Sequence, residues 1–175
     1  GVNAGNSIAS GGNYNTVIGD EAGTAITTGD ENTLVGYASG DALTTGGFNV
    51  AVGFEALTTE DAHGNNVAIG YRALKTLNAG ADGFNTSVGD HAGTSVTTGV
   101  QNTLIGGQAG DALTDADFNV AVGRQALTAD TLGSRSVAIG TYSLMTQNFT
   151  TATDAYNTAV GHHTGANITT GTANT

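Results

Sequence analysis

The clearest hydrophobic pattern in the chain is a five-residue phrase in which one polar residue precedes a short run of β-branched and small residues. The phrase reads Asn-[Thr/Val]-x-[Val/Ile]-Gly, with Ser136 in place of asparagine in one copy. Such short β-branched runs predict strands, and the glycine after each run predicts a tight corner. The phrases begin at residues 15, 32, 49, 66, 85, 102, 119, 136 and 157, and a tenth copy starts at residue 174.

The spacing of the phrases predicts a solenoid. Consecutive phrases start 17 residues apart, except for one step of 19 and one of 21. A unit of this size cannot bury a core alone, so its coils must stack on their neighbours. We therefore expect one all-β repeat domain over residues 1–175, a parallel β-solenoid (β-roll or β-helix) of 17-residue coils. Because the chain opens without Met and ends inside a repeat, we expect it to be a fragment.

A larger unit of four coils overlies the short repeat. Counting each coil from the first residue of its phrase, position 9 is Gly in two coils and Leu in the next two, and this alternation then repeats. The four-coil units span residues 15–84 and 85–156, and each closes with a longer coil. Insertions in solenoids form loops on one side. We expect loops at residues 79–84 and 148–156, four coils apart.

Strand alternation predicts that positions 2 and 4 of the phrase share one face while position 3 takes the other. Positions 2 and 4 hold only Thr, Val and Ile, and position 3 is apolar in eight of nine coils. One face would fill the lumen, and the other would form an apolar stripe about 40 Å long that self-association around a shared axis would cover. We assign that interface to position 3. Its apolar residues are Val17, Leu34, Ala51, Ala68, Leu104, Ala121, Ala138 and Ala159.

The second half of the coil predicts how the lumen is filled. In Gly coils, residues such as 22–29 and 92–99 suggest a second strand with one large apolar residue. Leu coils place that residue at position 9 and then turn polar. Lumen volume would then stay nearly constant from coil to coil. This packing leaves little room for a catalytic site, so we expect no enzyme and no catalytic residue.

The charge excludes two classes of partner. Fifteen acidic residues oppose four basic ones, for a net charge of −11. Nucleic-acid binding needs a cationic surface, so we expect no nucleic-acid partner. No stretch approaches the roughly 20 apolar residues of a membrane span, and direct membrane insertion is not expected.

Two phrases carry a resemblance to a known family. Residues 66–73 read Asn-Val-Ala-Ile-Gly-Tyr-Arg-Ala and residues 136–140 read Ser-Val-Ala-Ile-Gly, and both resemble the head repeat of trimeric autotransporter adhesins. The longer coil, as in Asn-Thr-Leu-Ile-Gly-Gly-Gln-Ala-Gly at residues 102–110, is more similar to repeat tracts of phage tail fibres. The resemblance implies a left-handed solenoid and a homotrimer. Adhesin coils are usually shorter than these.

The asparagine that opens each phrase predicts a structural ladder, with amides hydrogen-bonded between coils or back to the turn. A residue repeated in almost every coil is typical of structure rather than of catalysis. The predicted ladder residues are Asn15, Asn32, Asn49, Asn66, Asn85, Asn102, Asn119 and Asn157.

Two histidines are candidate metal ligands. His91 and His163 both fall at position 7 of Gly coils. Around a threefold axis, one histidine from each chain would form a ring able to hold a transition metal. A surface or interface histidine without metal is the favoured interpretation, so no metal or cofactor is expected. Acidic corner residues lack the register that calcium solenoids use.

Aromatic residues in the two insertions are candidate receptor contacts. Phe84, Phe149 and Tyr156 lie where the repeat breaks, and a specific site is best sought there. Packing of these rings against the coil below is the alternative.

We expect a structural or adhesive fibre segment, the shaft or head of a phage tail fibre or surface adhesin. It would be extracellular, on a virion or a bacterial surface, and its partners would be itself and a glycan or protein receptor. One alternative is a bacterial adhesin head that binds host matrix or glycans directly. Others are an ice-binding solenoid, suggested by threonine pairs such as Thr27-Thr28, and a β-helical polysaccharide-degrading enzyme.

Overall fold

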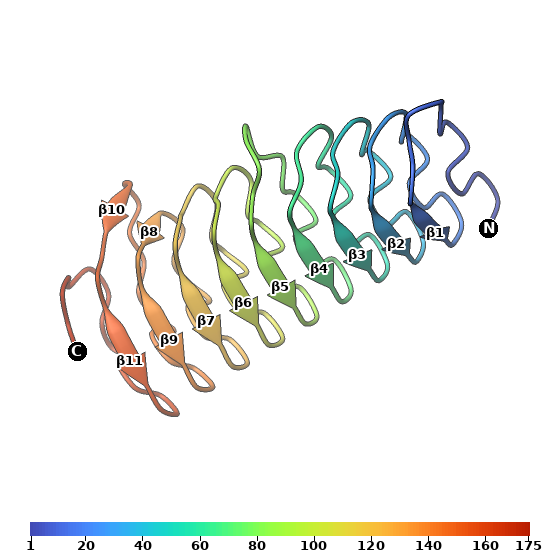
Figure 1. Cartoon of the computed structure of the whole chain (residues 1–175). Coiled ribbons are helices and arrows are strands. Elements are labelled where there is room, and N and C mark those ends of the chain that lie inside the picture. Colours follow the sequence, from blue (N-terminus) through green and yellow to red (C-terminus); the bar gives the residue numbers. More distant parts are fainter.

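The computed structural model describes all of residues 1–175 as a rod of stacked coils with the two termini at opposite ends (Figure 1). It confirms the all-β, parallel solenoid. The chain contains no helix, and so none that could cross a lipid bilayer. Its main sheet has nine parallel strands in chain order: β1 (Thr16–Ile18), β2 (Thr33–Val35), β3 (Val50–Val52), β4 (Val67–Ile69), β5 (Thr86–Val88), β6 (Thr103–Ile105), β7 (Val120–Val122), β9 (Val137–Ile139) and β11 (Thr158–Val160).

The strands pair in step along the whole rod. Positions 2, 3 and 4 of each phrase pair with the same positions of the next, as in Thr33 with Val50 and Leu34 with Ala51. The register survives both insertions, since Val67 pairs with Thr86 and Val137 with Thr158. Identical positions therefore form columns that run the length of the rod, about 4.8 Å apart from coil to coil.

The corner after each strand requires glycine, as predicted. Gly70 has φ of +136°, and a Cβ there would lie 2.3 Å from the carbonyl oxygen of Gly89 in the next coil. The corner glycines of the other coils show the same positive φ, between 127° and 142°. These corners let the chain turn while neighbouring backbones touch.

The second half of the coil differs from the prediction. Residues 22–29 and 92–99 form stacked turns and not a second strand. Backbone hydrogen bonds still join consecutive coils there, as from Ala25 N to Asp41 O at 3.0 Å. Left-handed backbone at positions 7 and 9 curls the chain too tightly for an extended strand; Leu57 and Leu74, for example, have φ of 53° and 48°.

Position 3 faces the lumen, which corrects the predicted interface. Leu34, Ala51, Ala68, Leu104, Ala121 and Ala138 are fully buried within a single chain, Ala159 is nearly so, and Val17 is half-buried against the same core. Their side chains line the inside of the coil with the other core residues. The outward-facing residues of the sheet are instead those at positions 2 and 4, which are half-buried or exposed.

Lumen volume is balanced between positions 3 and 9. A coil with Leu34 or Leu104 at position 3 has glycine at position 9, and a Cβ on Gly40 would lie 2.8 Å from Leu34 Cδ2. Four of the five coils with alanine at position 3 have leucine at position 9, as in Ala51 with Leu57, and these four leucines are fully buried; the last coil has Ala159 with Gly165. Large and small residues thus alternate across the lumen, as close packing requires.

The two insertions rise on the same side of the rod (Figure 1). In the second, Thr153–Asp154 forms β10, which pairs in parallel with β8 (Gly133–Ser134) of the preceding coil. Phe149 is only 6% exposed, and it lies so close to Gly133 that a Cβ there would be 2.8 Å from the ring. Most of the second insertion is therefore part of the solenoid wall.

Gly70→Ala tests the corner geometry. We expect a loss of about 2 kcal/mol or more in unfolding free energy, because the left-handed φ and the backbone contact both oppose a side chain. Urea unfolding followed by circular dichroism measures it. Gly80→Ala is the matched control, since an added Cβ there meets nothing within 4 Å. Equal stability of the two variants would contradict the corner assignment.

Candidate functional site

The asparagines at position 1 form a ladder that is buried from Asn32 to Asn157 and interrupted only at Ser136. The Oδ1 of each accepts the backbone N–H of the next one, as from Asn32 N to Asn15 Oδ1 at 2.9 Å and from Asn102 N to Asn85 Oδ1 at 2.9 Å. In all but one of the complete coils that begin with asparagine, Nδ2 donates to a carbonyl near the end of its own coil, as from Asn32 to Gly46 O at 2.9 Å; Asn66 Nδ2 donates instead to Gly64 O at 3.0 Å, at the end of the preceding coil. These amides therefore join coil ends and position the next coil.

Gln147 supplies a hydrogen-bonding amide where Ser136 replaces the asparagine of the ladder. Ser136 N still donates to Asn119 Oδ1 at 2.9 Å, but the serine side chain is too short to reach the next coil. Gln147, which is fully buried, donates to Ser136 Oγ at 3.0 Å and accepts from Asn157 Nδ2 at 2.8 Å. An amide from position 12 thus replaces the amide that position 1 lacks.

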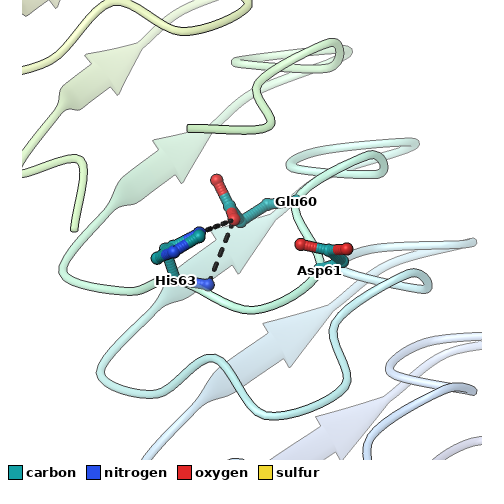
Figure 2. A group of neighbouring side chains, drawn as sticks. All are labelled: Glu60, Asp61 and His63. Atoms are coloured by element: carbon teal, nitrogen blue, oxygen red, sulfur yellow. Dashed lines mark hydrogen bonds and ion pairs between the residues drawn. The ribbon is translucent and has the colours of Figure 1, made fainter. Parts of the chain in front are cut away.

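Glu60, Asp61 and His63 form the group of side chains best placed to hold a metal ion. Their ligand atoms all lie within 4.8 Å of one another (Figure 2). Glu60 is fully buried, Asp61 is exposed, and His63 Nδ1 lies 3.5 Å from Glu60 Oε1. His63 Nδ1 is itself buried and makes no hydrogen bond.

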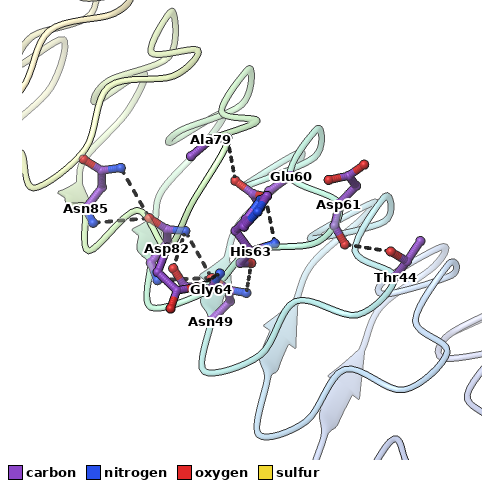
Figure 3. Close-up of polar contacts among 10 residues, drawn as sticks. Thr44, Asn49, Glu60, Asp61, His63, Gly64, Ala79, Asp82 and Asn85 are labelled. Carbon is purple, nitrogen blue, oxygen red and sulfur yellow. Dashed lines mark hydrogen bonds and ion pairs between the residues drawn. The ribbon is translucent and has the colours of Figure 1, made fainter.

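Backbone donors already satisfy the Glu60 carboxylate (Figure 3). Oε1 accepts from His63 N at 3.2 Å, and Oε2 accepts from Ala79 N at 3.1 Å in the next coil. Hydrogen bonds from N–H groups stabilise a buried carboxylate, and Ala79 is the residue at which the first insertion begins. The carboxylate therefore fixes the root of that insertion.

Asp130 has the same role four coils further on. It is fully buried at position 12, like Glu60, and its Oδ1 accepts from Gly133 N at 3.1 Å and Phe149 N at 2.9 Å. Gln147 donates to its Oδ2 at 2.6 Å. Position 12 thus carries a buried carboxylate in the coil before each insertion. The metal-ligand set is not repeated, because Thr131 and Gly133 stand where the first unit has Asp61 and His63. The shared function of Glu60 and Asp130 is to anchor the insertions.

The structure does not bring His91 and His163 together. They lie in the same column four coils apart, roughly 19 Å at the rung spacing. His91 Nδ1 lies 3.2 Å from Asp90 Oδ1, and its ring packs on Tyr71. His163 packs against Tyr142 and His162. Within one chain, neither histidine belongs to a cluster of metal ligands.

The predicted receptor contacts separate into two groups. Phe149 is buried and packs against the coil below, so it is not a receptor contact as predicted. Phe84 and Tyr156 are more than half exposed. Neither is peculiar to an insertion, because both occupy the residue immediately before a phrase, where the insertion has rejoined the regular coil.

The threonine pairs contribute to coil stacking. Thr27 Oγ1 donates to Thr44 O at 3.1 Å, and Thr44 Oγ1 donates to Asp61 O at 2.9 Å. These hydroxyls therefore link consecutive coils at this corner.

Among the acidic side chains, Glu55 accepts hydrogen bonds from Lys75 Nζ at 2.6 Å and from Arg72 Nε at 2.9 Å. The Lys75 hydrogen bond, aided by Arg72 and opposed by burial, holds the pKa of Glu55 below its usual value.

The outer face of the main sheet is largely apolar, with thirteen Val or Ile residues and five Thr residues among its eighteen. It consists of positions 2 and 4, which contain no charged residue. Its isoleucines are well exposed, and Ile105 is 38% exposed at the centre of the rod. We call the following eighteen residues the outer face: Thr16, Ile18, Thr33, Val35, Val50, Val52, Val67, Ile69, Thr86, Val88, Thr103, Ile105, Val120, Val122, Val137, Ile139, Thr158 and Val160.

Comparison of the chain with protein-family models, with curated proteins and with solved structures finds no match.

Glu60→Gln tests the anchoring role of the buried carboxylate. The amide replaces one acceptor oxygen by an NH₂ group that faces a backbone N–H, so we expect a loss of about 1–3 kcal/mol in unfolding free energy. Asp61→Asn, at an exposed side chain, is the control and should leave stability unchanged. Zn²⁺ that raises the melting temperature of the parent, but not of Asp61→Asn, would assign the cluster to a metal instead.

Gln147→Leu tests the repair of the ladder. Leucine is the natural residue at the equivalent position 77, so its shape suits the lumen. The change removes the donors to Ser136 and Asp130, and we expect a loss of about 1–3 kcal/mol in urea unfolding. Gln101→Leu, on the surface, should change stability by less than about 0.5 kcal/mol. Similar values for the two variants would show that the buried amide is dispensable.

Proposed function

We propose that the chain is a segment of a homotrimeric fibre, the shaft or head of a phage tail fibre or surface adhesin, which presents receptor-binding regions outside the cell. The outer face carries this proposal. Soluble monomers seldom expose a long, uncharged and largely apolar surface, and this one runs through all nine strands, about 40 Å at the rung spacing.

The outer face has the chemistry of a subunit contact. Its residues are β-branched and stiff, so packing them against another sheet loses little side-chain entropy. Because the strands pair in step, identical residues recur at each rung, and copies of the chain can align along a shared axis without a break in register. The threefold symmetry itself comes from the resemblance to trimeric adhesin heads and tail-fibre repeats.

A fibre role fits the shape and the core. The lumen is filled by side chains from end to end, and the coils stack into a straight rod (Figure 1). Rods of this kind suit projection of a binding region away from a virion or cell surface. An adhesin head that binds host matrix or glycans directly would use the same architecture and the same assembly.

A matched pair of substitutions on β6 tests the assembly. Light scattering of the purified chain should give about three times 17.3 kDa. Ile105→Asp places a charge on the outer face, so we expect folded monomers, whereas Leu104→Asp places one in the lumen and should abolish folding. A parent chain that is a stable monomer, or an Ile105→Asp variant that stays trimeric, would contradict the proposal.

A further inference from the structure

A second column of exposed residues runs beside the outer face. It consists of the residue immediately before each phrase, and we call it the edge column. Aromatic and non-aromatic residues alternate strictly along it, with an aromatic ring in every second coil. Its members are Tyr14, Glu31, Phe48, Asn65, Phe84, Gln101, Phe118, Arg135, Tyr156 and Ala173.

Backbone geometry keeps the edge column regular. All ten residues have left-handed backbone, with φ between 49° and 62°. Hydrogen bonds link the column from coil to coil, as from Phe48 N to Asp30 O at 3.0 Å and from Gln101 N to Gly83 O at 2.7 Å. Since insertions do not interrupt it, successive aromatic rings are two rungs apart, about 9.6 Å.

Folding does not account for the aromatic rings in this column. Phe48 and Phe84 are each 57% exposed, and no ring of the column stacks on another. Left-handed backbone is costly for a bulky residue and cheaper for asparagine, which already occupies the column at Asn65. The bulky left-handed residues Leu57 and Leu74 are fully buried in the core, whereas these exposed rings gain little from packing, which is a reason to look for a binding role.

A different column, which follows the corner glycine at the other end of the strand, contains aromatic residues that stack on one another. Tyr37, Phe54 and Tyr71 occupy three consecutive coils, and their ring centroids are 5.1 and 5.3 Å apart. Rings stacked this closely cover each other's faces. At the two-rung interval of the edge column, no second aromatic ring covers the face of each aromatic side chain.

We propose that the edge column binds a neutral, extended polysaccharide of β-1,4-linked pyranose units. Two such units span nearly the length of two rungs, so every second sugar can place its apolar face on a ring of the column. Glu31, Asn65 and Gln101 lie at the intervening rungs and can hydrogen-bond to sugar hydroxyls. The net charge of −11 opposes an anionic chain.

The inference gives a ligand class to the fibre proposed above, but the column belongs to a single chain and does not require the threefold assembly. Phe118 is expected to contribute less to glycan binding, because the Arg135 guanidinium lies 4.5 Å from its ring centre. Phe48 and Phe84 are therefore the pair to test.

The experiment measures binding of the purified chain to soluble β-1,4-glucan and to β-1,4-linked N-acetylglucosamine oligomers, by affinity electrophoresis and calorimetry. Binding of at least one is expected, with affinity rising once the oligomer is long enough to span two rings. Phe48→Asn and Phe84→Asn should each weaken binding about tenfold. Both should fold at least as stably as the parent, because asparagine suits the left-handed backbone.

Phe54→Asn, in the closely stacked column, is the matched control and should bind like the parent. No binding of either glycan, equal binding of an α-1,4-glucan, or unchanged binding by Phe48→Asn and Phe84→Asn would overturn the inference. So would separation of these variants into monomers, which would make the column a subunit contact. A monomeric parent that binds the glycan would leave this inference standing and refute only the trimer.

Discussion

The solenoid depends on the hydrogen bonds of one buried asparagine per coil. Seven of the nine coils have a single three-residue strand and the other two add only a two-residue one, so backbone pairing alone defines little of the perimeter. The asparagine amide offers an acceptor and two donors on a short side chain. It joins the start of the coil to its end and fixes the next coil in register. The arrangement around Ser136 shows how strong this requirement is, because a buried glutamine restores the missing amide.

The same ladder explains which part of the fold the sequence could predict. The period, the parallel strands and the corner glycines follow from the repeated phrase, because strand and turn chemistry are local. The orientation of the strand did not follow, since both of its faces are apolar. The buried asparagines show which face of the strand points into the lumen. Positions 1 and 3 lie on the same face of a strand, so an asparagine inside the coil places Leu34 and Ala51 inside as well.

The candidate site was harder to predict, because it depends on contacts between coils. Glu60 and Asp130 lie in the part of the Leu coils that turns polar after position 9, yet both occupy the lumen position that is apolar in most other coils. Their recurrence four coils apart, each before a longer coil, is the one sequence signal that could have identified them. Phe149 was misassigned for a similar reason, since its burial depends on pairing between β8 and β10.

The direction of the backbone hydrogen bonds determines how such a rod bears force. The bonds between coils lie along the long axis, as from Thr33 N to Asn49 O and from Gly36 N to Ile18 O. Tension along the axis is therefore carried by hydrogen bonds, while the covalent chain runs around the circumference. A pulled rod would release terminal coils one at a time, because each coil is held only by its neighbours. Each released coil adds 17 residues to the extended chain, or 19 or 21 for the two longer coils, so the molecule would lengthen in steps before its covalent chain came under load.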